Sequence, residues 1–479
     1  MKYIFAILSL CAVCVAQQIE QKGPIAIKGP ITVSSGTSPA PSFVQGFTGL
    51  GANTLLNRSS SVQCPATTGL NIARTEGCSA VIRDWGSGIL RTVDSKLYIT
   101  GGGHTGYGGN ELYGMSVLSA GASLDRYNNP SVPGTDDATI IAGNTGCQGG
   151  SRDGVAYTLG QVSGYNPLAI PPVINTTLSP GSNVCTPCVV GPSGYGCAPD
   201  SKHIYSQMAY IPPNSVNCVL GDFNYGFTGD AIFEYSGYGA WDGAGTGDDA
   251  WLFHFATSGH AGDWQRLDTL ATYTGGNHPA SDSNGFTVFN PNDGYIYMHA
   301  GNYYGKWNVC SNTYTRLSGA LAGGAWQAGV MVPTLGSSGT IVVFQISTFN
   351  GTKNVYQYDV ASDTQTSKTA VVNASCDLLT KTEVDGTYHV YNAGYAYDPD
   401  VGDIVIWPNF GNTVYSYVPG VSPTCSSTLY NQNDTVTNSN YGTHQSNGTF
   451  GRWQYVPSSK GFVLINDWNI QGWFLCRSA

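Results

Sequence analysis

The sequence predicts an all-β fold, a six-bladed β-propeller with a Cys-containing insertion between its first and second blades. Charged residues make up only 10% of the 479-residue chain, which has 63 Gly and 30 Tyr. This composition suits short, tightly turned strands that carry aromatic side chains. A strand that ends in Pro recurs five times, each time before a short apolar run. Small antiparallel sheets of this kind cannot bury both faces alone, so they are expected to stack radially.

The first blade is expected within residues 79–118. Residues 97–99 predict a buried strand, which the glycines at 101–103 end by letting the backbone turn, and residues 112–117 predict the next strand. The Gly-rich loop between them presents polar side chains, as loops that contact ligands commonly do. The candidate ligand-binding residues of this loop are His104, Tyr107, Asn110 and Glu111.

The other five blades are marked by their Pro-ended strands. These are AYIPPNS (209–215), TVFNPNDG (287–294), VMVPTLG (330–336), AYDPDVG (396–402) and QYVPSSKG (454–461). Apolar runs at 218–220, 295–298, 341–344, 404–407 and 462–465 predict second strands buried on both faces. Third strands are expected at 251–255, 306–309, 355–358, 414–417 and 473–476, and outer strands at 264–267 and 314–317.

The remaining segments are assigned by composition. The last blade has three predicted strands, so closing the ring requires a strand from residues 44–80, and the propeller is expected to span 44–479. Residues 119–204 hold four Cys and little periodicity, which predicts an insertion or a small disulfide-held subdomain. Residues 17–43 are rich in Pro, Gly and Ser. They predict a flexible arm, or a strand that pairs with a sheet edge in this or another molecule and allows self-assembly.

Residues 1–16 fit a secretory signal, because their apolar run is too short to span a bilayer. No later segment is expected to cross a membrane, and we expect an extracellular glycoprotein. Six N-x-S/T sequons support export: Asn57, Asn175, Asn350, Asn373, Asn433 and Asn447. The formal net charge of -10, without a Lys/Arg cluster, argues against nucleic acid or anionic lipid as a partner.

An oxidising compartment makes disulfides the expected state of the 13 cysteines. Two of them lie in the predicted signal, which leaves an odd number, so at least one is unpaired or pairs between chains. Spacing alone allows Cys64 to pair with Cys78 and Cys376 with Cys425, without determining the connectivity. The group Cys185-x-x-Cys188 with Cys197 indicates a stapled loop rather than a zinc site, because a fourth ligand at suitable spacing is missing.

Specific motifs in two places carry a family resemblance. They are the diglycine after residues 98–100 with the following GHxxYGGNExY loop (103–113), and the closing segment from GTFGR (448–452) to VLIND (463–467). On these motifs the chain resembles Kelch-like propellers of the galactose-oxidase central-domain superfamily, in an uncharacterised secreted branch. The resemblance covers residues 79–118 and 205–479.

The resemblance also raises copper chemistry, because the superfamily includes copper radical oxidases. Those enzymes need a Tyr cross-linked to a Cys, a Tyr followed by His, and a further His. Here Tyr391-Asn392 occupies the expected Tyr-His position, while Tyr388-His389 comes three residues too early, and residues 84–88 (DWGSG) contain no Cys. The copper site is therefore not matched, and no cofactor is expected.

Four histidines lie 9 to 13 residues before the Pro of a Pro-ended strand: His203, His278, His389 and His444. If those strands are innermost, the imidazoles could meet near the axis and bind a metal or act in acid–base catalysis. The spread of their offsets favours unrelated loop histidines that bond nearby backbone, and no metal site is predicted.

Carboxylates and aromatic residues give two further candidate groups. The carboxylate clusters that could serve glycoside hydrolysis are Asp248-Asp249, Glu111 with Asp84, and Asp398/Asp400/Asp403. The last cluster lies in a Pro-ended turn, where Asp favours bonding its own backbone. Tyr107 could form a sugar-binding surface with Tyr225, Trp241, Tyr303 and Tyr304, although Tyr and Trp also fill contacts between blades.

Two functional hypotheses follow. The first is a secreted, glycosylated, non-catalytic binding or structural module of the cell surface or extracellular matrix, which recognises a glycan or an extracellular protein. The alternative is an extracellular carbohydrate-active enzyme, a copper-dependent oxidase or a glycoside hydrolase, that uses the histidine-bearing face.

Overall fold

A computed structural model describes 41–42, 81–82, 86–101, 112–117, 124–127, 169–174, 185–189, 204–219, 226–236, 249–255, 262, 264–267, 285–300, 303–317, 327–346, 353–380, 393–408, 413–429, 448–465 and 473–477. They belong to one compact unit, Pro39–Ala479. This unit begins upstream of the predicted propeller boundary at residue 44.

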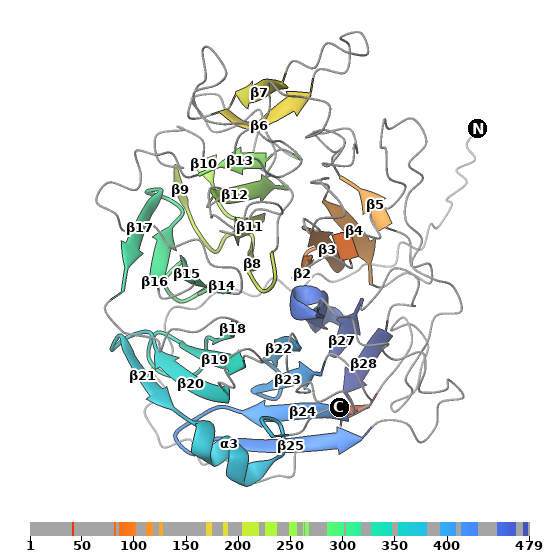
Figure 1. Cartoon of the computed structure of the whole chain (residues 1–479), viewed down its shortest axis with the longest axis vertical. Helices are drawn as coiled ribbons and strands as arrows, with labels where there is room; N and C mark the ends of the chain where they lie inside the picture. The colour runs from red at the N-terminus through yellow and green to blue at the C-terminus, as the bar shows by residue number, and fades with distance from the viewer. Residues whose placement is uncertain are drawn as a thin grey trace, which may run out of the picture. The chain divides into compact units, whose positions relative to one another are not determined.

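Six four-stranded antiparallel sheets, here called blades 1 to 6, make up most of the described chain (Figure 1). Blade 1 contains β2 (Ser87–Arg91), β3 (Lys96–Thr100), β4 (Tyr113–Ser116) and β5 (Leu124–Arg126). Blade 2 contains β8 (Met208–Ile211), β11 (Ala231–Ser236), β12 (Asp249–His254) and β13 (Trp264–Arg266). Blade 3 contains β14 (Phe286–Phe289), β15 (Tyr295–Ala300), β16 (Tyr303–Asn308) and β17 (Thr313–Arg316).

Blade 4 contains β18 (Gln327–Val332), β19 (Thr340–Ile346), β20 (Lys353–Asp359) and β21 (Thr364–Ser367). Blade 5 contains β22 (Gly394–Asp398), β23 (Asp403–Trp407), β24 (Thr413–Val418) and β25 (Thr424–Leu429). Blade 6 joins β26 (Trp453–Val456), β27 (Gly461–Leu464) and β28 (Trp473–Arg477) to β1 (Pro41–Ser42). Five sheets thus take their strands in chain order, and one combines both ends of the unit.

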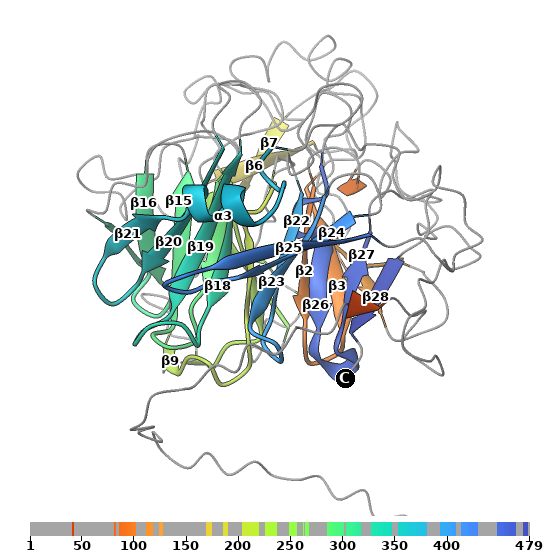
Figure 2. The ribbon, with the colours of Figure 1, turned by 90° about the horizontal axis from the view of Figure 1, so that it is seen from below.

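The first strands of the blades form a closed ring. Each contacts the first strand of the next blade, from β2 through β8, β14, β18, β22 and β26 back to β2. The five that Figure 1 labels, β2, β8, β14, β18 and β22, lie nearest its centre, and the side view in Figure 2 shows β18, β22 and β26 running in a similar direction. The predicted β-propeller fold is confirmed.

Apolar side chains hold neighbouring blades together. Alternate residues of a strand point to opposite sheet faces, so each blade packs against two neighbours. The described residues form six hydrophobic clusters, one at each interface of the ring. Between blades 5 and 6, for example, the rings of Trp407 and Trp453 lie 5.5 Å apart. Burial of aromatic and aliphatic groups at these interfaces is the main stabilising contribution.

Glycines on the first strands of blades 4 and 5 allow neighbouring blades to approach closely. A Cβ on Gly329 would lie 2.2 Å from the ring of Phe286, and one on Gly394 would lie 2.2 Å from the Cβ of Trp453. Larger residues there would push the blades apart.

Three sequence predictions need correction. Residues 218–220 were expected to form the second strand of blade 2, but β9 (Cys218–Val219) pairs with β10 (Gly226–Phe227) in a separate two-stranded sheet. The second strand is β11, whose buried Glu234 interrupts the apolar pattern.

Residues 119–204 are not wholly an insertion, because β5 belongs to blade 1. That segment also holds a hairpin of β6 (Ala169–Ile174) and β7 (Cys185–Val189). The closing strand β1 lies at residues 41–42, upstream of the predicted 44–80 window and inside the predicted arm.

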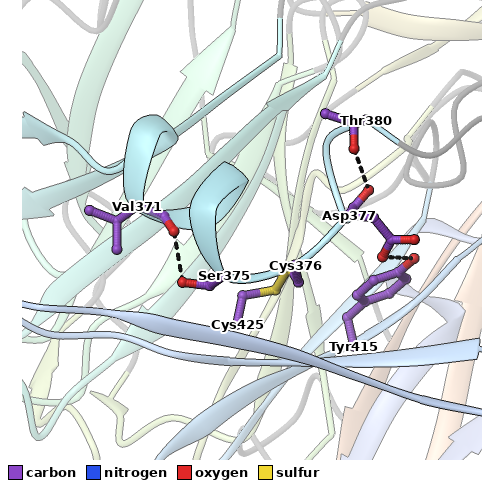
Figure 3. Close-up of a disulfide and its surroundings, with 7 residues drawn as sticks. All are labelled: Val371, Ser375, Cys376, Asp377, Thr380, Tyr415 and Cys425. Atoms are coloured by element: carbon purple, nitrogen blue, oxygen red, sulfur yellow. Dashed lines mark hydrogen bonds between the residues drawn. A yellow bond between two sulfur atoms is a disulfide. The ribbon is translucent and has the colours of Figure 1, made fainter.

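Two disulfides connect parts of the described chain. Cys376–Cys425 confirms the pair allowed by spacing, whereas Cys218–Cys310 was not predicted. The first joins the end of α3 (Thr369–Ser375), which follows blade 4, to the outer strand of blade 5 (Figure 3). Nearby, the hydroxyl of Tyr415 donates a 3.0 Å hydrogen bond to Asp377. Cys218–Cys310 connects β9 to the turn before β17 of blade 3. The other cysteines, Cys64 and Cys78 included, lie outside the described residues or have no described side chain.

Helix α3 carries the one predicted sequon that falls within the described residues. Asn373 is exposed to solvent, as N-glycosylation requires. The other five sequons lie outside the described ranges. In the described part of the chain, no helix has the length and apolar character of a membrane span.

Candidate functional site: the central channel

The eight predicted ligand-binding residues lie outside the described ranges: His104, Tyr107, Asn110, Glu111, His203, His278, His389 and His444. Asp84, Asp248, Tyr225 and Trp241 lie there too, and the side chain of Tyr303 is not described. Tyr304 is only 3% exposed, so it packs between blades 3 and 4 and cannot belong to a surface that stacks on sugars. The backbone N–H of Asp400 donates a 2.9 Å hydrogen bond to Asp398, which agrees with the turn role expected there.

A channel of about 450 Å³ runs between the first strands of all six blades. The position two residues before Pro supplies a large lining side chain in five blades: Tyr210, Phe289, Met331, Tyr397 and Tyr455. The sequence shows this spacing, but by itself the spacing marks the blades and does not indicate a binding site. A cavity of this size is in the range that binds small molecules.

Prolines surround one end of the channel, here called the proline mouth. Each follows the first strand of its blade: Pro212, Pro291, Pro333, Pro399 and Pro457. In blade 1 the exposed Thr92 takes this position. Proline suits a strand end, because it fixes φ and needs no ladder partner for its nitrogen.

Hydrogen bonds hold the tyrosines near this mouth, and two of these bonds join neighbouring blades. The hydroxyl of Tyr455 donates to Asp400 at 2.9 Å, and Tyr397 shares a 2.9 Å hydrogen bond with Thr334. Tyr210 donates to Asp230 at 2.9 Å, and Asp230 also forms a salt bridge of 2.7 Å with Arg91 of blade 1. These partners orient the phenol rings.

Two aromatic rings meet at the opposite end of the first strands, here called the floor. Tyr205 and Phe450 precede the first strands of blades 2 and 6, and their rings meet edge to face with centroids 5.1 Å apart. Both are buried, and both have φ near +50°, which side chains other than glycine rarely adopt. Because blade 1 separates these two blades, the rings meet in front of the start of β2. Their packing evidently offsets the backbone strain.

Two hydroxyl groups in the channel wall near the floor lack hydrogen-bond partners. Ser87 and Thr287 line the channel, are 1% and 3% exposed, and their side-chain oxygens have no partner in the structure. A buried hydroxyl without a partner is unfavourable by about 1–3 kcal/mol.

The described channel lining carries no ionisable acid or base other than tyrosine. Burial raises the pKa of three lining tyrosines, Tyr210, Tyr395 and Tyr455, above the ordinary value. These phenols therefore stay neutral at physiological pH. Hydrogen bonds to Asp230 and Asp400 raise the pKa of Tyr210 and Tyr455 further. The described part of the channel therefore offers apolar walls and neutral polar groups.

The ring closes beside the floor through the segment GTFGR at residues 448–452. Arg452 is fully buried and donates to three backbone carbonyls, those of Ile465, Gly86 and Gly448. A Cβ on Gly451 would lie 2.2 Å from the carbonyl oxygen of Gly88, so blade 6 and blade 1 touch through their backbones. In this segment Arg and Gly have a structural role.

Two described histidines were not among the predicted site residues. His254 is buried, and its Nε2 forms a 2.8 Å hydrogen bond with Gln265. His299 is 1% exposed and stacks on Phe286, and neither ring nitrogen has a hydrogen-bond partner in the structure. Burial lowers the pKa of His299 to about 3. Among the described residues, no three His, Cys, Asp or Glu side chains gather as a metal site.

Neither protein-family models nor curated proteins match this chain. Among solved structures, it is similar to a structural-genomics protein of unknown function from Bacteroides thetaiotaomicron, with 10% identity and a TM-score of 0.43 over 89% of this chain and 77% of the other. A chain of a mitotic checkpoint complex has 7% identity and a TM-score of 0.39 over 94% and 99% of the two chains. YjhT has 9% identity and a TM-score of 0.30 over 53% and 73%. Similarities this distant indicate no function.

Proposed function

We propose that the protein is a secreted, glycosylated, Kelch-like binding or structural module of the cell surface or extracellular matrix, which holds a glycan or an extracellular protein without transforming it. The observation that carries the proposal is the chemistry of the channel. General acid–base and nucleophilic catalysis need groups that ionise or are activated near neutral pH. The described lining offers neutral phenols, hydroxyls, one amide and apolar side chains.

Sequence and structure support the extracellular part of this proposal. The apolar run in residues 1–16 and the six sequons favour export. Two disulfides in the described chain suit an oxidising compartment. The closing motif of blade 6 and the loop 103–113 carry the resemblance to secreted Kelch-like propellers, and the copper residues of the related oxidases are not matched.

The test compares binding with turnover in one preparation. The full chain is produced by secretion from eukaryotic cells, and its metal content and N-glycan occupancy are measured. It is then screened on a glycan array and against immobilised extracellular-matrix proteins, and assayed for oxidation of simple alcohols and aldehydes and for glycoside hydrolysis. The expected result is saturable binding without turnover. Turnover with a stoichiometric metal would refute the proposal in favour of the enzyme hypothesis.

The opening loop is tested separately with the variants His104→Ala and Tyr107→Ala. If this loop contacts the ligand, as its sequence suggests, both variants weaken binding on the array while thermal stability stays unchanged. Unaltered binding by both variants would remove the loop from the site and leave the binding function intact.

A further inference from the structure

We propose that the proline mouth of the channel binds a cation on an apolar stem, the lysine side chain of an extracellular partner protein. The proposal rests on the binding function proposed above and names the chemistry of the partner. It depends on the aromatic rings at the mouth and on one carboxylate beside them. It involves neither the floor nor the loops that carry the predicted histidines.

Aromatic rings make up much of the channel wall near the mouth. Four of the five large side chains two residues before the prolines are aromatic: Tyr210, Phe289, Tyr397 and Tyr455. Each belongs to a different blade, so the rings are distributed around the axis. The π face of an aromatic ring attracts a cation within about 6 Å of its centre. A wall with several such rings therefore favours a cation over an anion.

The hydroxyl groups of two of these tyrosines are bonded at the rim of the mouth. Tyr397 shares its hydrogen bond with Thr334, and Tyr455 donates to Asp400. Both partners lie in the turn of the preceding blade, so each phenol crosses a blade junction and offers ring surface to the channel. Donation to a carboxylate also polarises the phenol of Tyr455, which strengthens its attraction for a cation.

Asp400 supplies the opposite charge for a lysine. It is exposed, and its carboxylate accepts a 2.9 Å hydrogen bond from the channel-lining Tyr455. Among the described residues, no Lys or Arg forms a salt bridge with it. Its charge is therefore available at the junction of blades 5 and 6, and the cation is expected on that side of the mouth.

The other charges around the mouth agree with a cationic ligand. Between the first and second strands, the described turns carry four aspartates and one lysine: Asp94, Asp230, Asp293, Asp400 and Lys460. Arg91, at the end of β2, is already paired with Asp94 and Asp230. An anionic side chain would approach a surface with more carboxylates than cations.

The rim of the mouth suits the stem of a lysine. Pro291 and Pro399 are exposed there, and Val401 is exposed in the same turn as Asp400. A lysine joins four methylene groups to a compact charge, so its stem can pack on these side chains while the ammonium meets the rings and the carboxylate. Because the turns are exposed, the ammonium keeps part of its water, which limits the cost of its burial.

The central test is Asp400→Asn, which removes the charge but keeps an oxygen that can accept the hydrogen bond from Tyr455. Binding of the peptide acetyl-alanyl-lysyl-alanine amide to the full secreted chain is measured by ligand-observed NMR and calorimetry. The peptide is expected to bind saturably, and Asp400→Asn should weaken it about threefold, as expected for an exposed ion pair.

Asp377→Asn is the matched control for the charge. Asp377 is also exposed and accepts a 3.0 Å hydrogen bond from a tyrosine, Tyr415, but it lies beside α3 and does not line the channel (Figure 3). The control removes the same charge from the protein and should leave binding unchanged. Equal effects of the two variants would show that only the net charge matters, and would overturn the proposal.

The role of the rings is tested with Tyr397→Leu, which keeps apolar bulk but removes the π face. It should weaken the peptide about fivefold, and Tyr397→Phe, which restores the ring, should restore binding. Tyr356→Leu makes the same change at a half-buried tyrosine outside the channel and should have no effect on binding. Melting temperatures are measured for every variant, and Asp400→Asn decides the outcome if Tyr397→Leu does not fold.

Two further peptides test the class of ligand. Norleucine in place of lysine removes only the amine and should weaken binding at least about fivefold, and glutamate should abolish it. The proposal is overturned if the lysine peptide does not bind, if either substitute binds equally well, or if Asp400→Asn and Tyr397→Leu bind like the unmodified protein. If the screen of glycans and matrix proteins finds a ligand that neither variant affects, the channel proposal fails while the binding function stands.

Discussion

The substitution His299→Phe is expected to stabilise the protein and to remove part of its sensitivity to acid. His299 stacks on Phe286 with ring centroids 5.9 Å apart, and Tyr304 lies 6.4 Å away. A phenyl ring can take the same place without burying two nitrogens that lack partners. At pH 7.5, where the imidazole is neutral in both states, the free energy of unfolding should rise by about 1–3 kcal/mol.

The pH dependence follows from the pKa of this histidine. It is about 3 in the fold and near 6.5 in the unfolded chain. Between these values the unfolded chain binds the additional proton, so stability is lost as the pH falls below 6.5. The loss is about 1.4 kcal/mol per pH unit, or about 2 kcal/mol at pH 5. His299→Phe lacks this contribution, whereas the other titrating groups are the same in both proteins.

Urea unfolding followed by tryptophan fluorescence at pH 7.5 and pH 5.0 measures both effects. The variant's advantage over the unmodified protein should grow by about 2 kcal/mol at the lower pH. Equal pH dependence of the two proteins would show that His299 is not buried as described. His254→Phe is the matched control, and it should destabilise, because it removes the 2.8 Å hydrogen bond to Gln265.

Two further predictions concern the closure of the ring, and a third concerns the disulfide between β9 and blade 3. Arg452→Met leaves three buried carbonyls without their donor, so the free energy of unfolding, measured by urea titration, should fall by at least about 4 kcal/mol. A loss below about 1 kcal/mol would contradict the role of this side chain. Gly451→Ala places a methyl 2.2 Å from a carbonyl oxygen of the neighbouring first strand and should lower the melting temperature, whereas Gly226→Ala, with no atom within 4 Å, should not. Cys218→Ser with Cys310→Ser removes a bridge across 92 residues, which should lower stability by about 2–4 kcal/mol; equal melting temperatures would refute that contribution.

The sequence contains most of the blade pattern, because strands have a simple period. A strand that ends in Pro and is followed by a continuous apolar run predicts a first strand and a fully buried second strand, as β22 and β23 show. The pattern fails at blade 2, where β11 carries the buried Glu234, and the apolar run beginning at Cys218 precedes it in the chain. A local pattern cannot tell which of two candidate strands pairs with β8, because pairing depends on contacts across the sheet.

The sequence by itself predicted the class of fold and allowed the pair Cys376–Cys425, both of which the structure contains. Each depends on local composition or spacing. Only the tertiary structure decided which side chains meet at the axis. Residues two positions before each Pro line one channel because the five strands that carry them close into a ring together with β2. The partner of Cys218 was likewise set by the packing of blade 3 beside blade 2, which no spacing along the chain encodes.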